Sequence, residues 1–333
     1  MIDVAKGIAI ILVLIGHSIQ YASGASYSSS GAFYDNWVFK IIYSFHMPLF
    51  MIISGYLFNN SIGRKTTKAI LIDKLRTLLL PIFAFAFVAF WVRYDSGLCL
   101  IDQIRRYFSF TRYTLWFLWA LFYSSIGVTL IHKFFKDNIF VYILVFAVSI
   151  CLPDKYYFEL YKFMFPCFVV GYFAGKNRWL DYIKKHSKII AIITLFLFVA
   201  MLQFYNTECY VYMSGSYLFG STTPLRQLGV DVFRVIVGVV GSVVVISLLM
   251  NIYTKKRNDG ITKTLCFFGK NTMGIYCIQN YFWILFPGIV SGVIRPIFVN
   301  RLIVFLVCLA LSCVITLLLK KMRVLNFVFL GGR

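Results

Sequence analysis

Residues 3–17 read DVAKGIAIILVLIGH, and this stretch decides the fold class. A membrane-spanning helix needs about 20 mostly apolar residues, and the apolar run that starts here continues to residue 22. Nine similar runs follow, so the expected spans are 4–22, 38–58, 78–92, 114–132, 138–152, 157–175, 187–205, 230–252, 265–286 and 298–320. The sequence therefore predicts an all-α polytopic membrane protein with about ten transmembrane helices in one bundle, and counts of nine to eleven stay open. Residues 1–333 are expected to form a single membrane-embedded domain.

The composition excludes a water-soluble globular protein. Hydrophobic residues make up 60% of the chain and charged residues only 14%, whereas soluble domains carry about 25% charged residues. The net charge of +21 comes from basic residues that cluster between the apolar runs. Such clusters are typical of loops that face the cytoplasm and anionic lipid. The expected partner of this charge is therefore the lipid bilayer, and no nucleic acid is expected.

The loop charges predict the orientation. Segments 59–77, 176–188 and 253–264 and the C-terminal tail are rich in Lys and Arg and lie on one side if ten spans alternate. On the other side, 23–37 has neither residue and 206–228 has only Arg226. The positive-inside rule then places both termini in the cytoplasm, in the inner (cytoplasmic) membrane of the cell. Residues 93–113 oppose the rule with four arginines, so this segment either uses its charge or marks an error in the span count.

The eight cysteines show neither a CxxC pair nor metal-ligand spacing, so no metal site is expected. Six lie in or beside apolar runs and are expected to be buried small side chains. Cys99 and Cys209 fall in segments placed outside, where a disulfide between them stays open. Gly171 and Gly175 form a pair of small residues four apart, which is typical of close helix packing.

One helical stripe in the first span carries ionisable groups. His17 follows Lys6 by 11 residues, which is three turns plus about 20°, so both project from one face about 16 Å apart. Asp3 lies about 40° off the same line. Because an ionisable residue inside a membrane is costly, His17 is a functional candidate. The alternative is that Asp3 and Lys6 anchor the helix end and His17 is a satisfied polar residue of the bundle.

The second span adds His46, at a depth similar to that of His17. Two histidines on consecutive antiparallel helices can converge, and histidine suits proton transfer near neutral pH. Pro48 interrupts the backbone hydrogen bonds there, which suits a residue that lines a cavity; the alternative is a satisfied histidine beside a proline kink. His132 and His186 fall at helix ends and are expected to be solvated. Asp231 and Arg234, three residues apart in the eighth expected span, are expected to pair on one helix face.

The chain resembles acyltransferase family 3, a family of integral-membrane acyltransferases, and within it the branch described as fucose 4-O-acetylase-like. The resemblance rests on DVAKGIAIILVLIGH at 3–17 and SFHMPLFMIISGYLF at 44–58. Weaker matches are Arg76 with Pro81, LWFL at 115–118, GYFAGK at 171–176 and GKNTMGIY at 269–276. Many members O-acetylate cell-surface polysaccharides. One departure is Gln279, which stands where relatives often have a histidine.

The resemblance implies acetyl transfer from acetyl-CoA to a sugar hydroxyl of a polysaccharide or of its lipid-linked precursor. The resemblance implies that His17 matches the catalytic base of the family and that Lys6 matches the basic residue of its motif, which is often Arg. It also implies that acyl-CoA is supplied from the cytoplasm. We expect Lys6 and Arg76 to bind the CoA phosphates and His46 to assist His17. An acyl-histidine intermediate is the second variant. The remaining candidates, for acceptor contact or support, are Asp3, Trp116, Arg226, Asp231, Arg234 and Gln279.

In this interpretation acetyl-CoA is a co-substrate, the saccharide is the acceptor, and no permanently bound cofactor is expected. The competing interpretation is a transporter of a lipid-linked saccharide or acyl donor, since several spans with intramembrane charges also fit an exporter. The hydropathy pattern shows no inverted repeat and no paired broken helices that would favour it. A packing subunit would leave two histidines at matched depth without an explanation.

Overall fold

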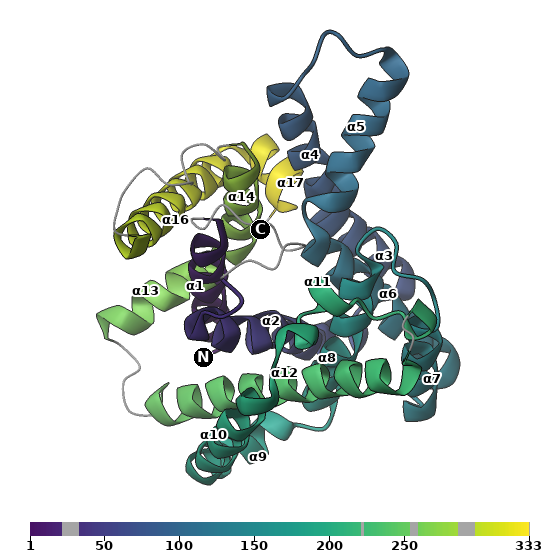
Figure 1. Ribbon diagram of the computed structural model, residues 1–333, viewed down its shortest axis with the longest axis vertical. Coiled ribbons are helices and arrows are strands. Elements are labelled where there is room, and N and C mark those ends of the chain that lie inside the picture. The colour runs from purple at the N-terminus through teal and green to yellow at the C-terminus, as the bar shows by residue number, and fades with distance from the viewer. Residues whose placement is uncertain (22–32, 221–222, 254–258, 286–296, 333) are drawn as a thin grey trace.

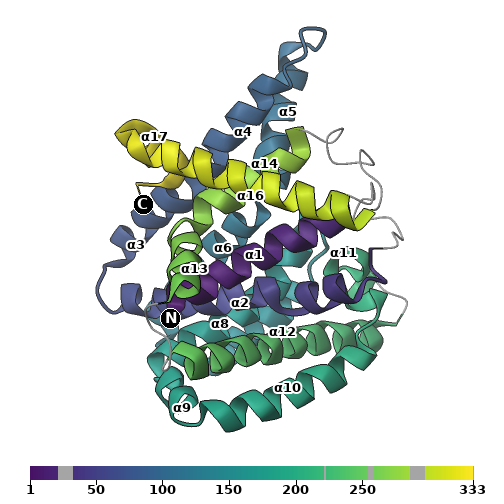
Figure 2. The same ribbon diagram turned by 90° about the vertical axis from the view of Figure 1, so that its left-hand side faces the viewer.

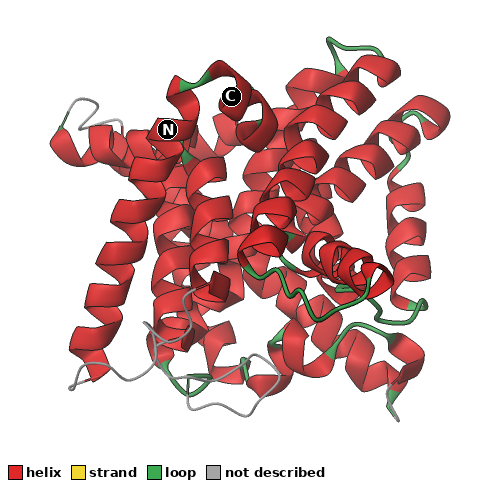
Figure 3. Ribbon diagram, turned by 90° about the horizontal axis from the view of Figure 1, so that it is seen from above, coloured by secondary structure: helices red, strands yellow, loops and turns green. Residues whose placement is uncertain are grey.

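The computed structural model describes residues 1–21, 33–220, 223–253, 259–285 and 297–332, and every regular element in these ranges is helical (Figure 1). The predicted all-α polytopic membrane fold is thereby confirmed. The N- and C-terminal ends lie at the same end of the bundle in Figure 3. We call the end of the bundle where α1 begins the N-terminal face, and the end where α1 finishes the opposite face.

The centre of the bundle is formed by α1 (Ile2–Tyr21), α2 (Trp37–Ile62), α8 (Phe158–Lys176) and α12 (Pro224–Tyr253), with α10 (Ser187–Phe204) packed against α12 (Figure 2). Helices α2 and α8 approach backbone to backbone. A Cβ atom on Gly55 would lie 2.0 Å from the Phe168 carbonyl oxygen, and one on Gly171 would lie 2.0 Å from that of Ile52. Gly175 is nearly as close to α2 at Tyr56. The sequence interpretation of Gly171 and Gly175 as packing residues is therefore correct.

Among the described residues, seven helical segments are long and apolar enough to cross a membrane. They are α1, α2, 67–92, α6 (Trp116–Phe135), α10, residues 224–252 of α12, and residues 299–321 of α16 (Ile297–Lys321). Segment 67–92 joins α3 (Thr67–Lys74), a π-helical turn (Leu75–Leu79) and α4 (Leu80–Val92).

Three of the ten expected spans differ in the structure. Segment 138–152 is the short α7 (Ile139–Ile150), and 157–175 is α8, whose 19 residues include Glu159 and Lys162. Segment 265–286 is divided at Asn271 into α13 (Gly260–Lys270) and α14 (Thr272–Leu285). The apolar pattern located these helices, but composition alone could not show where a run bends.

The arginine-rich segment 93–113 is largely helical rather than a loop. Helix α5 (Leu100–Tyr113) folds back against α4, and the two project from the bundle as a hairpin (Figures 1 and 2). Arg105 lies 3.1 Å from Asp102, and Arg106 lies 3.9 Å from Asp95. Local carboxylates therefore neutralise two of the four arginines, which weakens the segment's effect on orientation.

Short helical elements lie in the connections between the long helices and near the C-terminal end. These are α9 (Trp179–Lys185), α11 (Val211–Ser214), the C-terminal α17 (Arg323–Leu330) and two 3₁₀ turns, Thr207–Cys209 and Leu218–Gly220. The disulfide left open between Cys99 and Cys209 does not form, because both thiols are free. Cys99 is exposed and contacts Asp102, whereas Cys209 is buried.

A buried carboxylate ties α6, α7 and α8 together at the N-terminal face. Asp137 accepts hydrogen bonds from Lys176 at 2.6 Å, from His132 at 2.9 Å and from the hydroxyls of Tyr142 and Tyr172, each at 2.9 Å. Burial by itself raises the pKa of this carboxyl, but the four hydrogen bonds outweigh it and hold the pKa of Asp137 below its usual value. His132 is exposed, as expected from the sequence, and it also belongs to this cluster.

We expect Asp137→Asn to lower the thermal stability of the purified protein. The substitution removes the charge that the Lys176 ammonium, the His132 ring and two hydroxyls contact, a loss of about 1–3 kcal/mol. Asp181→Asn, an exposed position on α9, is the matched control and should melt like the wild type. A carboxylate whose pKa is lowered by folding stabilises the folded protein at pH values above its unfolded pKa. The difference in melting temperature between the wild type and Asp137→Asn should therefore vanish as the pH falls through the folded pKa of Asp137. Equal melting temperatures at neutral pH would contradict a stabilising role.

Candidate functional site

A hydrogen bond between α1 and α14 holds the His17 side chain in place. Its Nδ1 atom lies 2.8 Å from Oε1 of Gln279, and the same oxygen accepts a hydrogen bond of 2.7 Å from Nε1 of Trp283. An indole N–H can only donate, so the Gln279 oxygen must face both groups. His17 Nδ1 therefore carries the hydrogen, and Nε2 is the nitrogen that can take up a proton. Tyr21 stacks on Trp283 and closes one side.

His46 is buried on α2 and has the same tautomer. Its Nδ1 atom lies 2.7 Å from the carbonyl oxygen of Ile42, and a carbonyl can only accept, so Nε2 is again the open nitrogen. The Tyr43 ring lies 4.7 Å from that of His46, and a Cβ atom on Gly16, the neighbour of His17, would lie 2.5 Å from it. Tyr43 therefore packs against both His46 and the turn of α1 that carries His17, and the convergence of the two histidines stays a prediction.

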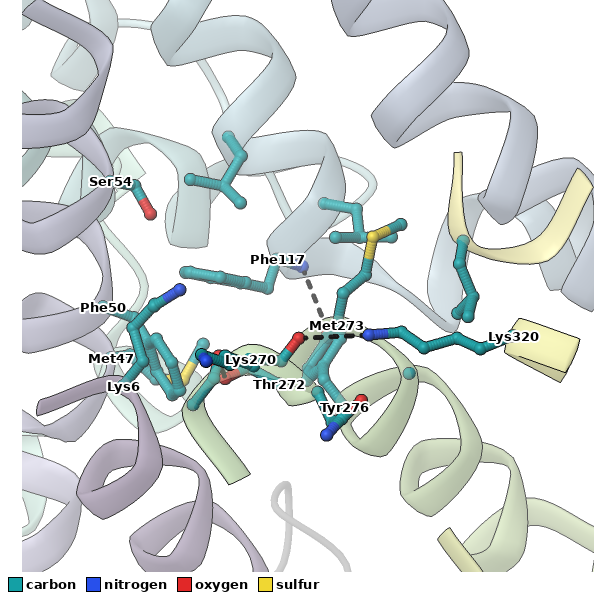
Figure 4. Close-up of a pocket in the computed structure, with 16 residues that line it drawn as sticks. Lys6, Met47, Phe50, Ser54, Phe117, Lys270, Thr272, Met273, Tyr276 and Lys320 are labelled. Carbon is teal, nitrogen blue, oxygen red and sulfur yellow. Dashed lines mark hydrogen bonds between the residues drawn. The ribbon is translucent and has the colours of Figure 1, made fainter. Parts of the chain in front are cut away.

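A cavity of about 170 Å³ opens on the N-terminal face. Three lysines from three helices line it, Lys6 of α1, Lys270 of α13 and Lys320 of α16 (Figure 4). Lys320 donates to the Lys270 carbonyl oxygen at 3.4 Å. Within the described parts of the chain, neither Lys270 nor Lys320 has a carboxylate within 4 Å, whereas Lys6 pairs with Asp3 at 2.8 Å. The mouth is therefore electropositive, which suits a phosphate-bearing ligand.

The cavity is apolar toward the centre of the bundle. Met47, Phe50 and Phe117 form its inner lining, and the Tyr276 hydroxyl accepts a hydrogen bond of 3.3 Å from the Phe117 amide. A second recess of about 30 Å³ is lined by Tyr43, Met47, Trp116, Tyr205, Tyr210 and His46, among others. Met47 lines both recesses, so its side chain contacts both the lysine-lined cavity and the crevice that holds His46.

Segment 207–217 covers this crevice on the side of the opposite face. Asp154 accepts hydrogen bonds from the amides of Ser216 at 2.6 Å and Tyr217 at 2.9 Å, and it also pairs with the buried Lys162 at 2.7 Å. Arg234 pairs with Asp231, as the sequence predicted, and donates to the Gly215 carbonyl oxygen. These buried charges therefore hold the covering segment in place and do not line the crevice.

The other candidates divide between the two faces. Trp116 lines the crevice with His46, and Asp3 supports Lys6. Arg226 pairs with Glu208 at 2.7 Å in a polar cleft on the opposite face. Arg76 does not line the lysine cavity; it is half-exposed and lies 3.6 Å from Asp73.

Sequence reasoning missed Lys270 and Lys320 as cavity residues and the place of Met47 in both recesses. Lys270 entered only through the GKNT stretch of the family resemblance, and Lys320 counted among the tail charges that indicate the orientation. Met47 adjoins His46 in the strongest motif, which was the available signal. In the described residues, no group of three His, Cys, Asp or Glu side chains could hold a metal ion.

Comparison with known proteins agrees with this arrangement. A model of the acyltransferase domain (Acyl_transf_3) matches residues 1–321. Nodulation protein NolL of Mesorhizobium japonicum is 32% identical over 218 residues, which cover 63% of this chain and 57% of that protein. Nodulation protein NolL of Sinorhizobium fredii is 30% identical over 194 residues, which cover 53% and 48%.

The chain thus matches about half of the length of these curated relatives. No solved structure matches it significantly. The family match spans nearly the whole chain, including α1, α2 and the GKNT stretch, which carry the histidines and the lysine cavity. The protein therefore belongs to acyltransferase family 3.

Proposed function

We propose that this membrane protein transfers an acetyl group from cytoplasmic acetyl-CoA to a saccharide hydroxyl presented at the opposite face. The observation that carries the proposal is that two recesses share Met47 in their lining, one of them lined by three lysines and the other by His46. A donor and an acceptor that arrive from different sides of a membrane need such an arrangement. The basic segments 59–77 and 176–188 support the N-terminal face as the cytoplasmic one.

The lysine cavity suits the donor. Lys6, Lys270 and Lys320 are the cations for the CoA phosphates, and they replace the pair of Lys6 and Arg76 expected from the sequence. A volume of about 170 Å³ accepts the narrow acyl-pantetheine end of the donor and leaves the nucleotide at the mouth. Displacement of the Met47 side chain, which has three rotatable bonds and adapts readily, brings the thioester toward the histidines.

The proposed reaction uses the Nε2 atoms of His17 and His46, which are the ring nitrogens that can take up a proton. The acceptor hydroxyl oxygen attacks the thioester carbonyl carbon while His17 Nε2 takes the hydroxyl proton. The C–S bond then breaks, the ester forms, and the proton returns to the leaving CoA thiolate. Gln279 acts through His17 as a positioning residue, since its oxygen holds Nδ1. His46 supplies a second base in the same enclosure.

We expect His17→Ala to abolish acetyl transfer while the protein still inserts and folds. A general base accelerates the reaction by a factor of about 10²–10⁴, and alanine at this position can neither accept the proton nor hydrogen-bond to Gln279. Gln279→Ala should lower kcat with little change in the KM for acetyl-CoA, because it loosens the ring but leaves the donor cavity intact. The measurement is transfer from radiolabelled acetyl-CoA by protein in nanodiscs. A well-folded His17→Ala variant with near-normal transfer would remove His17 from the mechanism.

The same assay separates the enzyme from the competing transporter. An acetyltransferase consumes labelled acetyl-CoA and releases free CoA in proportion to labelled glycan. A transporter of a lipid-linked saccharide would leave the label on CoA. The proposed function fails if glycans from cells with the intact gene and from cells without it carry equal acetylation by mass spectrometry.

We expect Lys270→Gln and Lys320→Gln to raise the KM for acetyl-CoA, each by about tenfold, as for the loss of one charge-assisted contact. Lys6→Ala should do the same and Lys6→Arg should not. Arg76→Gln is the matched control, because Arg76 is basic but lies outside the cavity. Equal KM values for Lys270→Gln and the wild type, or a raised KM for Arg76→Gln, would move the phosphate site elsewhere.

The orientation has a direct test with an impermeant maleimide on intact cells. Native Cys99, exposed at the tip of the α4–α5 hairpin, should label from outside. Lys184→Cys, exposed on α9, should label only after the membrane is opened. Each site is tested on a background without other cysteines. The reverse pattern would place the lysine cavity outside and exclude a cytoplasmic donor.

A further inference from the structure

A wide aromatic groove lies beside the α4–α5 hairpin, apart from both recesses of the proposed reaction. Its volume is about 740 Å³, and its lining comes from α4, α5, α6, the 152–157 connection and α8. Phe108, Tyr123 and Tyr156 line it and are each about half exposed, at 50%, 51% and 53%. Trp119 is held by a hydrogen bond of 2.9 Å from its indole nitrogen to the Thr111 carbonyl oxygen. An open groove lined by these aromatic side chains suits a bound hydrocarbon chain.

Two cations line this aromatic groove. The Arg112 guanidinium lies 4.1 Å from the centre of the Tyr156 ring, and Lys155 is exposed at the adjacent connection. Neither has a carboxylate within 4 Å in the described ranges. A guanidinium can contact a ring face and still present N–H groups that match a phosphate. The groove therefore combines an apolar lining with an unneutralised site for an anion.

The groove continues into a polar cleft. Pro153 and Lys155 line both, and the cleft, of about 580 Å³, also contains Glu208, Arg226 and Gln227. Carboxylate, amide and guanidinium groups together are the partners that sugar hydroxyls need. Residues of segment 208–214 line this cleft on one side and the His46 crevice on the other. One short segment thus separates the cleft from a candidate catalytic histidine.

We propose that the acceptor is a lipid-linked saccharide whose hydrocarbon chain lies in the groove, whose linking phosphate binds Arg112 and Lys155, and whose sugar occupies the cleft. This inference rests on the proposed function and specifies its acceptor. The order of surfaces, apolar then cationic then polar, matches the order of parts in such a molecule. A free polysaccharide would leave the groove and the two cations without a role.

The arginines of segment 93–113 then have a physical explanation. Arg105 and Arg106 face local carboxylates, at Asp102 and Asp95. Arg112 instead reaches the groove at the base of the hairpin. Its charge serves a ligand on the opposite face, so this segment departs from the positive-inside pattern without altering the orientation.

The test measures binding to the purified full-length protein in neutral-lipid nanodiscs by native mass spectrometry. The probes are a polyprenyl monophosphate, the polyprenyl alcohol of the same length, inorganic phosphate and phosphatidylglycerol. We expect the polyprenyl phosphate to bind, the alcohol to bind at least about tenfold more weakly, and an excess of either inorganic phosphate or phosphatidylglycerol to fail as a competitor. Equal binding of the alcohol, or displacement by either competitor, would overturn the proposal.

Variants locate the site. Arg112→Gln with Lys155→Gln should weaken polyprenyl phosphate binding about tenfold and leave the alcohol unaffected, as expected for losing two partly exposed charge-assisted contacts. Arg112→Lys with Lys155→Arg keeps both charges and should retain binding, which controls for folding. Arg105→Gln, on the same helix but paired with Asp102, should bind like the wild type. Unchanged binding in the double Gln variant would contradict the site.

The outcome for the groove is separable from that for the enzyme. If the double Gln variant has lost the polyprenyl phosphate but still acetylates a lipid-linked saccharide as the wild type does, the groove is a lipid site unconnected with the acceptor, and the inference fails while the function stands. If the wild type binds polyprenyl phosphate yet never consumes acetyl-CoA with any acceptor, the proposed function fails.

Discussion

The close contact of α1 with α13 and α14 is the constraint on which the candidate site depends. A Cβ atom on Gly269 would lie 1.8 Å from the Asp3 carbonyl oxygen, and one on Gly7 would lie 2.1 Å from that of Leu265. Only glycine permits this approach. It brings Lys6 beside Lys270 at one end of α1, and it sets α14 so that Gln279 reaches His17 near the other. The GKNT stretch thus has a packing reason as well as a chemical one.

The charges of the lysine cavity differ from the buried charges behind the covering segment. In the described residues Lys270 and Lys320 have no carboxylate partner within 4 Å, whereas Asp154 and Asp231 neutralise the buried Lys162 and Arg234. Neutralised buried charges add order without attracting an anion. The charges near the covering segment are therefore structural, and those in the cavity are available to a ligand.

The sequence predicted the parts that follow from local pattern. Apolar runs gave the helices, and the spacing of Lys6 and His17 gave one shared face, because both depend only on helical geometry. It did not predict Lys270 and Lys320 in the cavity or Arg76 outside it, since their places depend on how α13, α16 and the π-helical turn Leu75–Leu79 meet in space. The bend at Asn271 and the helical hairpin at 93–113 were missed for the same reason: tertiary contacts decide them.

Gln279 determines where the proton can go. A histidine at this position could accept a proton from His17 and pass it on, whereas an amide can only hold the Nδ1 hydrogen in place. Under the proposed function, a proton that His17 takes at Nε2 leaves through Nε2 again, to the departing thiolate. Tyr43 packs against both His46 and Gly16 of α1, so one aromatic side chain ties the histidine of α2 to the helix that carries the proposed base.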